Sequence, residues 1–454
     1  MSPEEMSRRR ALQTGALGAL AVGMAAGGAF AMSHPTDEGA DSIMQQDDSP
    51  RKAEAVRWGR VSVKDFGAVG DGVADETGAF QRALDAVGKA GGGDVYAPPG
   101  RYLFRGSLNV PVSTNLVGSF RSVPAHNGIR DAGLPKPGDD GTTLMPTAHQ
   151  GNEEGPAFIT LNTNSVLQGV TVFYPEQDPK AAPKPYPWAV RMLGKNPAVL
   201  DTELLNPYNA IDTTTTERHL IRCVHGQPLR RGIKVDQIYD IGRIEDVHWN
   251  PWWSMSEPVM KFMGEEGEGF ILGKTDWEYM VNCFCIMYRV GFRFTRFQHG
   301  PGNTVLTQCG SDVGPVAVLV EDCQAHAGIA FNNSQFMAGI EVAASNTGPL
   351  KFVNCGFWPI PTTDWHANLS GSGHVTFNGC HFSDWAMKTP GTPAIKARCS
   401  GLTVTSCDFM AAGKNQIEIE EGVRSAIVVG NRLRGGARVV DRTGKAQIGF
   451  NTDG

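Results

Sequence analysis

Short runs of alternating apolar and polar residues recur through the second half of the chain. Five such runs, each with apolar residues at its second and fourth positions, are GIKVD at 232–236, GFRFT at 291–295, GIAFN at 328–332, GIEVA at 339–343 and QIEIE at 416–420. A period of two predicts β-strands that bury one face. We therefore expect many short strands whose second and fourth residues point into a core.

A second pattern has a longer period. The segments VLVEDCQA, LKFVNCGF, VTFNGCHF and LTVTSCDF place Cys323, Cys355, Cys380 and Cys407 after apolar runs, and the same frame extends to Val170, Cys223, Val247 and Asn431. Successive spacings of 24, 25 and 27 residues, with one of 32, indicate a solenoid built of stacked coils. Nine cysteines raise the alternative of disulfides, but the number is odd and the frame favours a buried ladder of free thiols.

The segment before these repeats predicts an end cap. Residues 61–73 read VSVKDFGAVGDGV, and the following segment places four apolar residues, Phe80, Ala83, Leu84 and Val87, on one face of a short helix. Asp75 is the expected N-cap, and the glycines at 91–93 end the helix. An amphipathic helix here covers the open end of a solenoid core.

The stretch from Val61 to about Phe120 resembles the N-terminal signature of the pectate-lyase-like superfamily. That superfamily includes relatives of polygalacturonase-type glycoside hydrolases, exo-glucanases, lyases, epimerases and phage tailspikes. The resemblance implies an all-β fold, a right-handed parallel β-helix with a short N-terminal capping helix, forming one domain over 58–454. It also implies a substrate on the outer face of the sheet near the middle coils, and it leaves a homotrimer open.

Three other segments have distinct compositions. Residues 1–31 contain SRRRALQ followed by a short apolar stretch, which resembles a twin-arginine export signal; a membrane anchor is the alternative, although the stretch is short for a span. Residues 32–57 are acidic and are expected to form a flexible spacer. Residues 173–217 are rich in proline and are expected to form a long loop. We expect a secreted, periplasmic or cell-surface protein with no membrane association after signal removal.

Composition excludes several classes of function. Hydrophobic residues make up 41% and charged residues 19%, which is not typical of a disordered chain. A net charge of −6 provides no basic field for a nucleic-acid partner. No metal-binding, nucleotide-binding or serine-nucleophile motif is found, so neither a cofactor nor a metal is expected.

Tryptophan is concentrated in the middle of the chain. Four of the nine tryptophans, at 249, 252, 253 and 277, fall within 29 residues. Trp249 occupies the repeat position of Phe357 and is expected in the core. The others are candidate platforms for sugar rings, with packing of a bulky loop as the alternative. The expected substrate-binding residues are Lys234, Arg243, Trp252, Trp253, Trp277, Tyr279 and Arg293.

Four carboxylates in the same region are the candidate catalytic groups. On the strand 232–236 we expect Ile233 and Val235 to point inward, which leaves Lys234 and Asp236 outside. Asp240 follows at the next turn, and Asp276 and Glu278 alternate on one side of DWEY. Glycosidases use two carboxyl groups about 5 to 9.5 Å apart, and neighbouring coils lie about 4.8 Å apart. Ordinary solvated acids are the alternative.

These observations predict a carbohydrate-active enzyme that cleaves glycosidic bonds by carboxylate acid/base catalysis. The polygalacturonase pattern of paired aspartates is absent, which argues against pectin as the substrate. Lys234, Arg243 and Arg293 keep a polysaccharide lyase open, and a fructosyl-type transferase is a further enzymatic alternative. A glycan-binding β-helix without catalytic activity is the remaining one.

Overall fold

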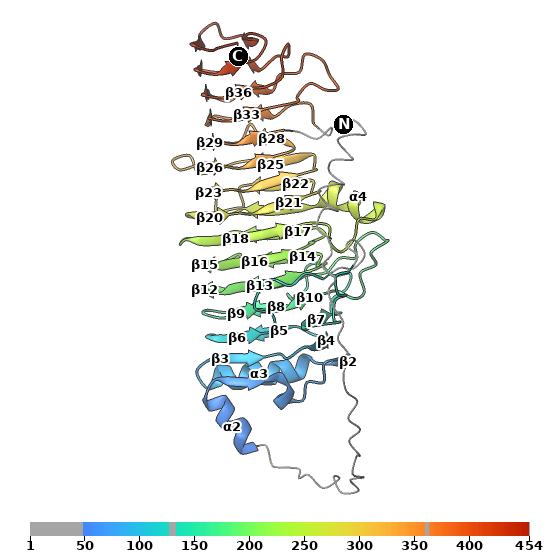
Figure 1. Ribbon diagram of the computed structural model, residues 1–454. Coiled ribbons are helices and arrows are strands. Elements are labelled where there is room, and N and C mark those ends of the chain that lie inside the picture. Colours follow the sequence, from blue (N-terminus) through green and yellow to red (C-terminus); the bar gives the residue numbers. More distant parts are fainter. Residues whose placement is uncertain (1–48, 127–132, 359–362, 454) are drawn as a thin grey trace, which may run out of the picture. The chain divides into compact units, whose positions relative to one another are not determined.

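The computed structural model describes residues 49–126, 133–358 and 363–453, and the proposed export signal lies outside them. The strands stack as successive coils in sequence order from the N-terminal to the C-terminal end of this region (Figure 1), and the ladders between coils are parallel. The architecture is a right-handed parallel β-helix, as the sequence predicts.

One face is a 13-stranded sheet that takes one strand from each coil. Its strands are β5 (Leu108–Val110), β8 (Ile159–Leu161), β11 (Trp188–Met192), β14 (Asn209–Asp212), β17 (Arg231–Val235), β19 (Glu268–Leu272), β22 (Val290–Phe294), β25 (Val316–Val320), β28 (Gly339–Val342), β31 (Ala367–Leu369), β34 (Ile395–Ala397), β37 (Ile417–Ile419) and β40 (Val439–Asp441). Ile233 pairs with Ile211 and Phe270, and these buried residues form rows along the core.

A 26-stranded sheet completes the coils. Its longer strands include β13 (Ala198–Leu204), β16 (Leu220–Gly226), β18 (Gly242–Trp249), β20 (Glu278–Val281), β23 (Thr304–Thr307), β26 (Ile329–Asn332), β29 (Leu350–Val353), β32 (His374–Asn378), β35 (Gly401–Thr405) and β38 (Ser425–Val429). Short strands follow a sharp bend, among them β10 (Thr171–Val172), β21 (Phe284–Ile286), β24 (Gly310–Asp312), β27 (Gln335–Phe336), β30 (Gly356–Phe357), β33 (His381–Phe382), β36 (Asp408–Phe409) and β39 (Arg432–Leu433).

The N-terminal coils add the remaining strands of this sheet, and β41 closes it at the other end. They are β1 (Arg60–Ser62), β2 (Asp71–Asp75), β3 (Gly93–Tyr96), β4 (Gly100–Phe104), β6 (Thr114–Val117), β7 (Thr142–Pro146), β9 (Val166–Gln168) and β41 (Gln447–Gly449). A separate pair joins β12 (Gly194–Lys195) to β15 (Thr216–Glu217).

The bend between the long and short strands explains the cysteine frame. At each bend one residue has a positive φ, including Asn354, Gly379 and Ser406, and the next residue points inward. The cysteines that follow, at 355, 380 and 407, are buried and free, which confirms the predicted ladder. A left-handed residue redirects the chain within one position, and asparagine and glycine tolerate that conformation best.

The prediction from the sequence assigned two of the cysteines, Cys223 and Cys323, to the wrong position of the repeat. Cys323 lies beyond β25, where its thiol contacts Asn346, so it belongs to a different turn. Cys223 has a φ of 53° and is itself the bend residue, while Val224 takes the inward position. The 32-residue spacing arose because Cys309 and Ser334, which occupy the true ladder positions, were not included.

The predicted capping helix is α3 (Thr77–Lys89), whose buried residues include Phe80, Ala83, Leu84 and Val87. Its N-cap position is Glu76, not Asp75, but Asp75 still accepts hydrogen bonds from the backbone and hydroxyl of Thr77. A second helix, α2 (Ser49–Arg57), occupies the end of the expected spacer, and its partly buried Ala55 and Val56 pack against the core.

The long loop predicted over 173–217 is wrong in extent. Residues 173–187 carry no strand, but β11, β12, β13, β14 and β15 follow within the range. Proline density misled the prediction because most of the prolines fall before β11, while the later ones occupy connections between strands. The third helix of the described region is α4 (Glu257–Glu266), which follows β18. Among the described residues, no helix is both long and apolar enough to cross a membrane.

Candidate active-site groove

A groove lies on the outer face of the 13-stranded sheet across β11, β14, β17, β19 and β22. Lys234 and Arg293, two of the predicted substrate-binding residues, line it. Both occupy outward positions of their strands, next to the inward Ile233 and Phe292. We refer to this hollow as the charged groove; Glu153, Glu154, Asp212, Arg231 and Glu268 also line it.

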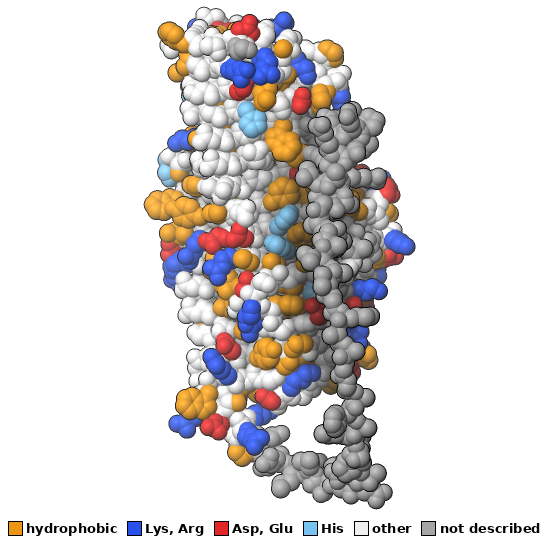
Figure 2. All heavy atoms as spheres, viewed as in Figure 1, with side chains coloured by type: hydrophobic (Ala, Val, Ile, Leu, Met, Phe, Trp, Pro, Cys, Tyr) orange, Lys and Arg blue, Asp and Glu red, His pale blue; other side chains and the backbone are white. Residues whose placement is uncertain are grey.

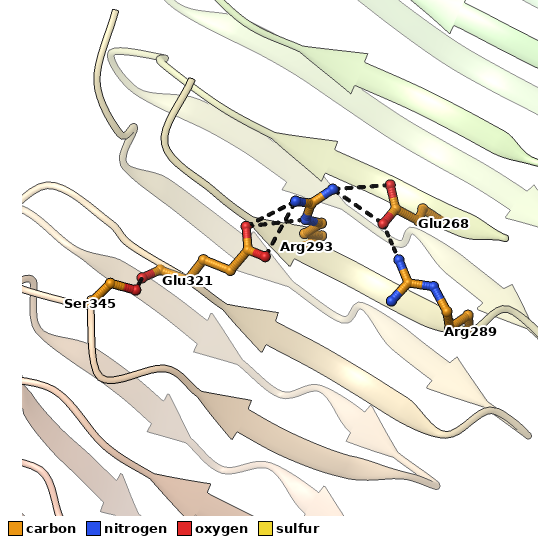
Figure 3. Close-up of polar contacts among 5 residues, drawn as sticks. All are labelled: Glu268, Arg289, Arg293, Glu321 and Ser345. Carbon is orange, nitrogen blue, oxygen red and sulfur yellow. Dashed lines mark hydrogen bonds and ion pairs between the residues drawn. The ribbon is translucent and has the colours of Figure 1, made fainter. Parts of the chain in front are cut away.

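A chain of ion pairs forms one end of the charged groove (Figure 3). Arg293 Nη1 lies 3.2 Å from Glu268 Oε1, and its Nη2 donates to Glu321 Oε2 at 3.0 Å. Arg289 also donates to Glu268, whose side chain is only 8% exposed. A buried carboxylate is costly without such partners, so the two arginines compensate the burial of Glu268 beside the groove.

A loop before β8 forms the opposite wall. Glu153 accepts hydrogen bonds from Arg230, from Arg231 Nη1 at 2.6 Å and from Asn209 Nδ2 at 3.1 Å. These contacts tie the loop to the starts of β14 and β17. The next residue, Glu154, is exposed and forms no ion pair with any described residue, so its carboxyl group is available to a ligand.

Between these walls the floor carries an acid and a base on adjacent strands. Asp212 and Lys234 are register partners, and Asp212 Oδ1 accepts hydrogen bonds from the backbone and hydroxyl of Thr214. Lys234 Nζ lies 5.1 Å from the centre of the Phe297 ring, a cation–π contact, and forms no ion pair within the described region. Lys234 therefore presents an uncompensated positive charge to whatever occupies the groove.

The predicted catalytic carboxylates lie elsewhere, in the stacked connections from β17 to β18 and from β19 to β20 and at the start of β20. Asp236 is 4% exposed and accepts a hydrogen bond from Lys274 N at 2.9 Å, so its expected place on the outer surface is wrong. The strand alternation ends at Val235, and the chain then turns. Glu278 is fully buried, with Oε1 2.9 Å from His219 Nε2. The positive φ of Trp277 interrupts the alternation expected for Asp276 and Glu278.

Asp276 and Asp240 are partly exposed, but both are engaged in turn contacts. Partial burial disfavours ionisation of Asp276, yet hydrogen bonds from Lys274 and Gln324 outweigh it and lower its pKa. The hydrogen bond from Arg218 lowers the pKa of Asp240. A general acid that works near neutral pH needs a raised pKa, so neither environment favours that role.

The remaining predicted ligands are divided between two other regions. Arg243 and Tyr279 are adjacent register partners on β18 and β20, and the exposed Trp277 precedes β20. Trp253 is 2% exposed, so no sugar can stack on it, whereas Trp252 is half-buried on the 26-stranded side. Trp249 is fully buried, as predicted.

The groove also contains residues that were not predicted from the sequence, among them Glu153, Glu154, Asp212, Arg231 and Glu268. Asp212 lies in the segment that was predicted as a long loop and ends the strand β14, and Glu153 lies in a segment that no pattern had marked. Glu268 starts the run EGFIL, whose burial on both sides of the strand removes the alternation that marks β17. Among the described residues, no cluster of three or more metal-ligating side chains is present.

Comparison with known proteins supports the resemblance seen in the sequence. A family model described as rhamnogalacturonase A/epimerase, pectate lyase-like, matches residues 60–182. The chain is 46% identical over 65 residues to mannuronan C5-epimerase AlgE1 of Azotobacter vinelandii, a match that covers 13% of this chain and 5% of that protein. It is 60% identical over 45 residues to alginate lyase 7 of the same organism, covering 10% and 5%.

Among solved structures, the DFA-IIIase of Arthrobacter chlorophenolicus A6 without its lid aligns with a TM-score of 0.49 and 11% identity, covering 87% of this chain and 98% of that one. The chain thus spans about a twentieth of the length of the two curated relatives named above. The pectate-lyase-like resemblance inferred from residues 61–120 is confirmed by the family match.

Proposed function

We propose that the chain is an exported carbohydrate-active enzyme that cleaves glycosidic bonds of a polysaccharide bound in the charged groove. The observation that carries this proposal is the pairing of unlike carboxyl groups along one hollow. Glu268 is buried and paired with Arg289 and Arg293, whereas Glu154 is exposed and has no described ion-pair partner. Glycosidases need one carboxylate and one carboxylic acid in different environments.

In this proposal the bound sugar covers the exposed Glu154 and removes water from its carboxyl group, which favours the protonated form that a general acid needs. Glu154 then protonates the oxygen of the departing sugar as the bond from that oxygen to C1 breaks. Glu268 either attacks C1 directly or removes a proton from the water that attacks it. Water then supplies the hydroxyl group at C1, and its other proton returns to the carboxyl groups. Lys234 and Arg293 hold substrate hydroxyl or carboxylate groups against the floor of the groove.

The named relatives support a carbohydrate substrate, because their names describe epimerisation and lysis of uronate polymers. A second candidate reaction, β-elimination on a uronate polysaccharide, is favoured by Lys234. Its unpaired ammonium group can neutralise a substrate carboxylate, while a neighbouring base removes the proton at C5 and the C4–oxygen bond breaks. The product then contains a carbon–carbon double bond instead of a new hydroxyl group.

One experiment separates these reactions. The purified protein is incubated with neutral and uronate polysaccharides, and new reducing ends and ultraviolet absorbance of unsaturated sugars are measured together. Reducing ends without absorbance indicate hydrolysis, both signals indicate elimination, and a cyclic or transferred product without reducing ends indicates a transferase. Glu268→Gln and Glu154→Gln should each abolish hydrolysis, whereas the control Glu341→Gln, on β28 and outside the groove lining, should not. Full activity in both groove variants would refute the assignment.

A further inference from the structure

A second hollow lies on the 26-stranded sheet, across the short strands that follow the bends. Its outward residues form one register row, in which His225 pairs with His248, His248 with Phe284, and Phe284 with Gly310. We call it the histidine cleft; Asn282 and Gln308 lie on its rim. In Figure 2, histidine side chains lie beside hydrophobic ones on the face where Figure 1 labels β16, β18 and β21.

Aromatic rings form one end of this cleft. Trp252 packs against both histidines, with ring centroids 5.4 Å from His225 and 4.8 Å from His248, and the His248 ring lies 5.1 Å from that of Phe284. Burial lowers the pKa of His225, which keeps its imidazole neutral at neutral pH. The rings of Trp252, His225 and Phe284 therefore contribute an aromatic surface beside the cleft.

Gly310 lies on the floor of the cleft between its neighbours in the row, Phe284 and Gln335. A Cβ at this position would lie 3.2 Å from Phe284 Cδ2 and 3.1 Å from Gln335 O, so the absence of a side chain lets the Phe284 ring lie close to the sheet. Gln335, which also lines the cleft, accepts a hydrogen bond of 2.8 Å from Trp358 Nε1 through its Oε1.

The rim supplies polar groups of one chemical kind. Asn282, Gln308 and Asn333 occupy successive bend positions with φ of 54°, 56° and 50°, and each presents an exposed amide beside the rings. Amides both donate and accept hydrogen bonds, which suits vicinal hydroxyl groups. The one carboxylate in the lining, Asp246, already accepts a hydrogen bond of 2.6 Å from Asn282 Nδ2.

We propose that the histidine cleft is a second carbohydrate-binding site, which takes an uncharged sugar unit of a polysaccharide. The sugar's C–H face packs on the Trp252 and histidine rings, and its hydroxyl groups bind the amides of Asn282 and Gln308. The near-absence of charge contrasts with the charged groove and selects neutral sugars over uronates. The site retains a polysaccharide at the surface and does not depend on which reaction the charged groove performs.

The test measures binding by isothermal titration calorimetry of the Glu268→Gln protein with neutral hexasaccharides of β-1,4-glucose, α-1,4-glucose, β-1,4-xylose and β-2,1-fructose, and with hexamannuronate. At least one neutral probe should bind. Trp252→Ala should weaken that binding by about tenfold or more, and Gln308→Ala, which removes an exposed amide from the rim, by about threefold or more. Glu341→Gln, on the 13-stranded sheet and outside the lining of both sites, should leave it unchanged.

Trp58→Ala is the matched control, because Trp58 is an exposed tryptophan at 75% exposure in the N-terminal segment, and it should bind as the parent does. Circular dichroism and the melting temperature establish that each variant is folded. Gln308→Ala, at an exposed position, keeps the test decisive if Trp252→Ala fails to fold. The proposal is overturned if no neutral probe binds, if Gln308→Ala binds as tightly as the parent, or if only hexamannuronate binds.

Discussion

His219 Nε2 lies 2.9 Å from Glu278 Oε1 in the interior of the β-helix, and neither side chain reaches solvent. Thr275 Oγ1 donates to the other carboxylate oxygen at 3.2 Å. This arrangement assigns Glu278 to stability, although the sequence predicts it as a catalytic group. We expect Glu278→Gln to lower the free energy of unfolding by about 1 to 3 kcal/mol, because the amide places an N–H group where one of the two buried carboxylate oxygens now accepts a hydrogen bond.

The measurement is urea denaturation alongside activity per folded molecule. Folded Glu278→Gln protein should retain the activity of the parent, and Glu341→Gln should change neither quantity. An inactive but equally stable Glu278→Gln protein would restore the catalytic assignment.

The charge of Lys234 should contribute to activity but not to stability. Lys234→Met keeps the aliphatic stem beside Phe297 and removes only the charge. We expect kcat/KM on the preferred polysaccharide to fall by about tenfold to a hundredfold, since a charge-assisted contact is worth about 1.5 to 3 kcal/mol. The melting temperature should stay unchanged, because no described carboxylate loses an ion-pair partner. If the substrate is a uronate, the loss should shrink at high salt; an unchanged kcat/KM would remove Lys234 from the site.

The cysteine ladder makes a prediction about redox sensitivity. All nine cysteines are free, and Cys355, Cys380 and Cys407 occupy successive coils. Dithiothreitol should therefore leave the melting temperature unchanged. Cys380→Ala should lower the free energy of unfolding by about 1 kcal/mol, because it creates a small cavity. A marked drop in melting temperature on reduction would show that the thiols pair in solution.

His366 should make stability fall in acid. Burial lowers its pKa to about 3, and Nε2 lies 2.8 Å from Ser383 O. In the unfolded chain the pKa is about 6.5, so as the pH falls below that value only the unfolded state takes up the proton, and stability is lost down to about pH 3. The His366→Gln protein should be less stable than the parent at neutral pH, but it should lose less stability than the parent between about pH 7 and about pH 4.5. Parallel stability curves for the two proteins would contradict this.

The proposed export signal depends on Arg8 and Arg9. Replacing both with lysine preserves charge but removes the paired guanidinium groups of the twin-arginine pattern. We expect the variant to remain in the cytoplasmic fraction of a bacterial host with twin-arginine transport, whereas the parent is exported. Immunoblots of cell fractions measure this, and efficient export of the variant would refute the assignment.

The fold could be predicted from the sequence because every coil has the same requirement, an inward residue directly after a tight bend. The VH pairs at 224–225 and 247–248 occupy that position in adjacent coils. The same repetition would have revealed the row from His225 to His248 if the frame had started at Val224 instead of Cys223. The site was harder to predict because its residues are joined by register between coils rather than by spacing in the sequence. Asp212, Lys234 and Arg293 lie in one region only because the four coils from β14 to β22 stack, and Glu153 reaches it through arginine contacts from another loop.

The stacking of the charged groove across five coils also fixes a length. From β11 to β22 there are four steps between parallel strands, which amount to about 19 Å along the axis. Because the coils are hydrogen-bonded to one another, this distance cannot stretch when a ligand enters. A polysaccharide that binds as we propose must therefore match this fixed length, and adding or deleting a whole coil would change the number of sugar units that fit in the groove.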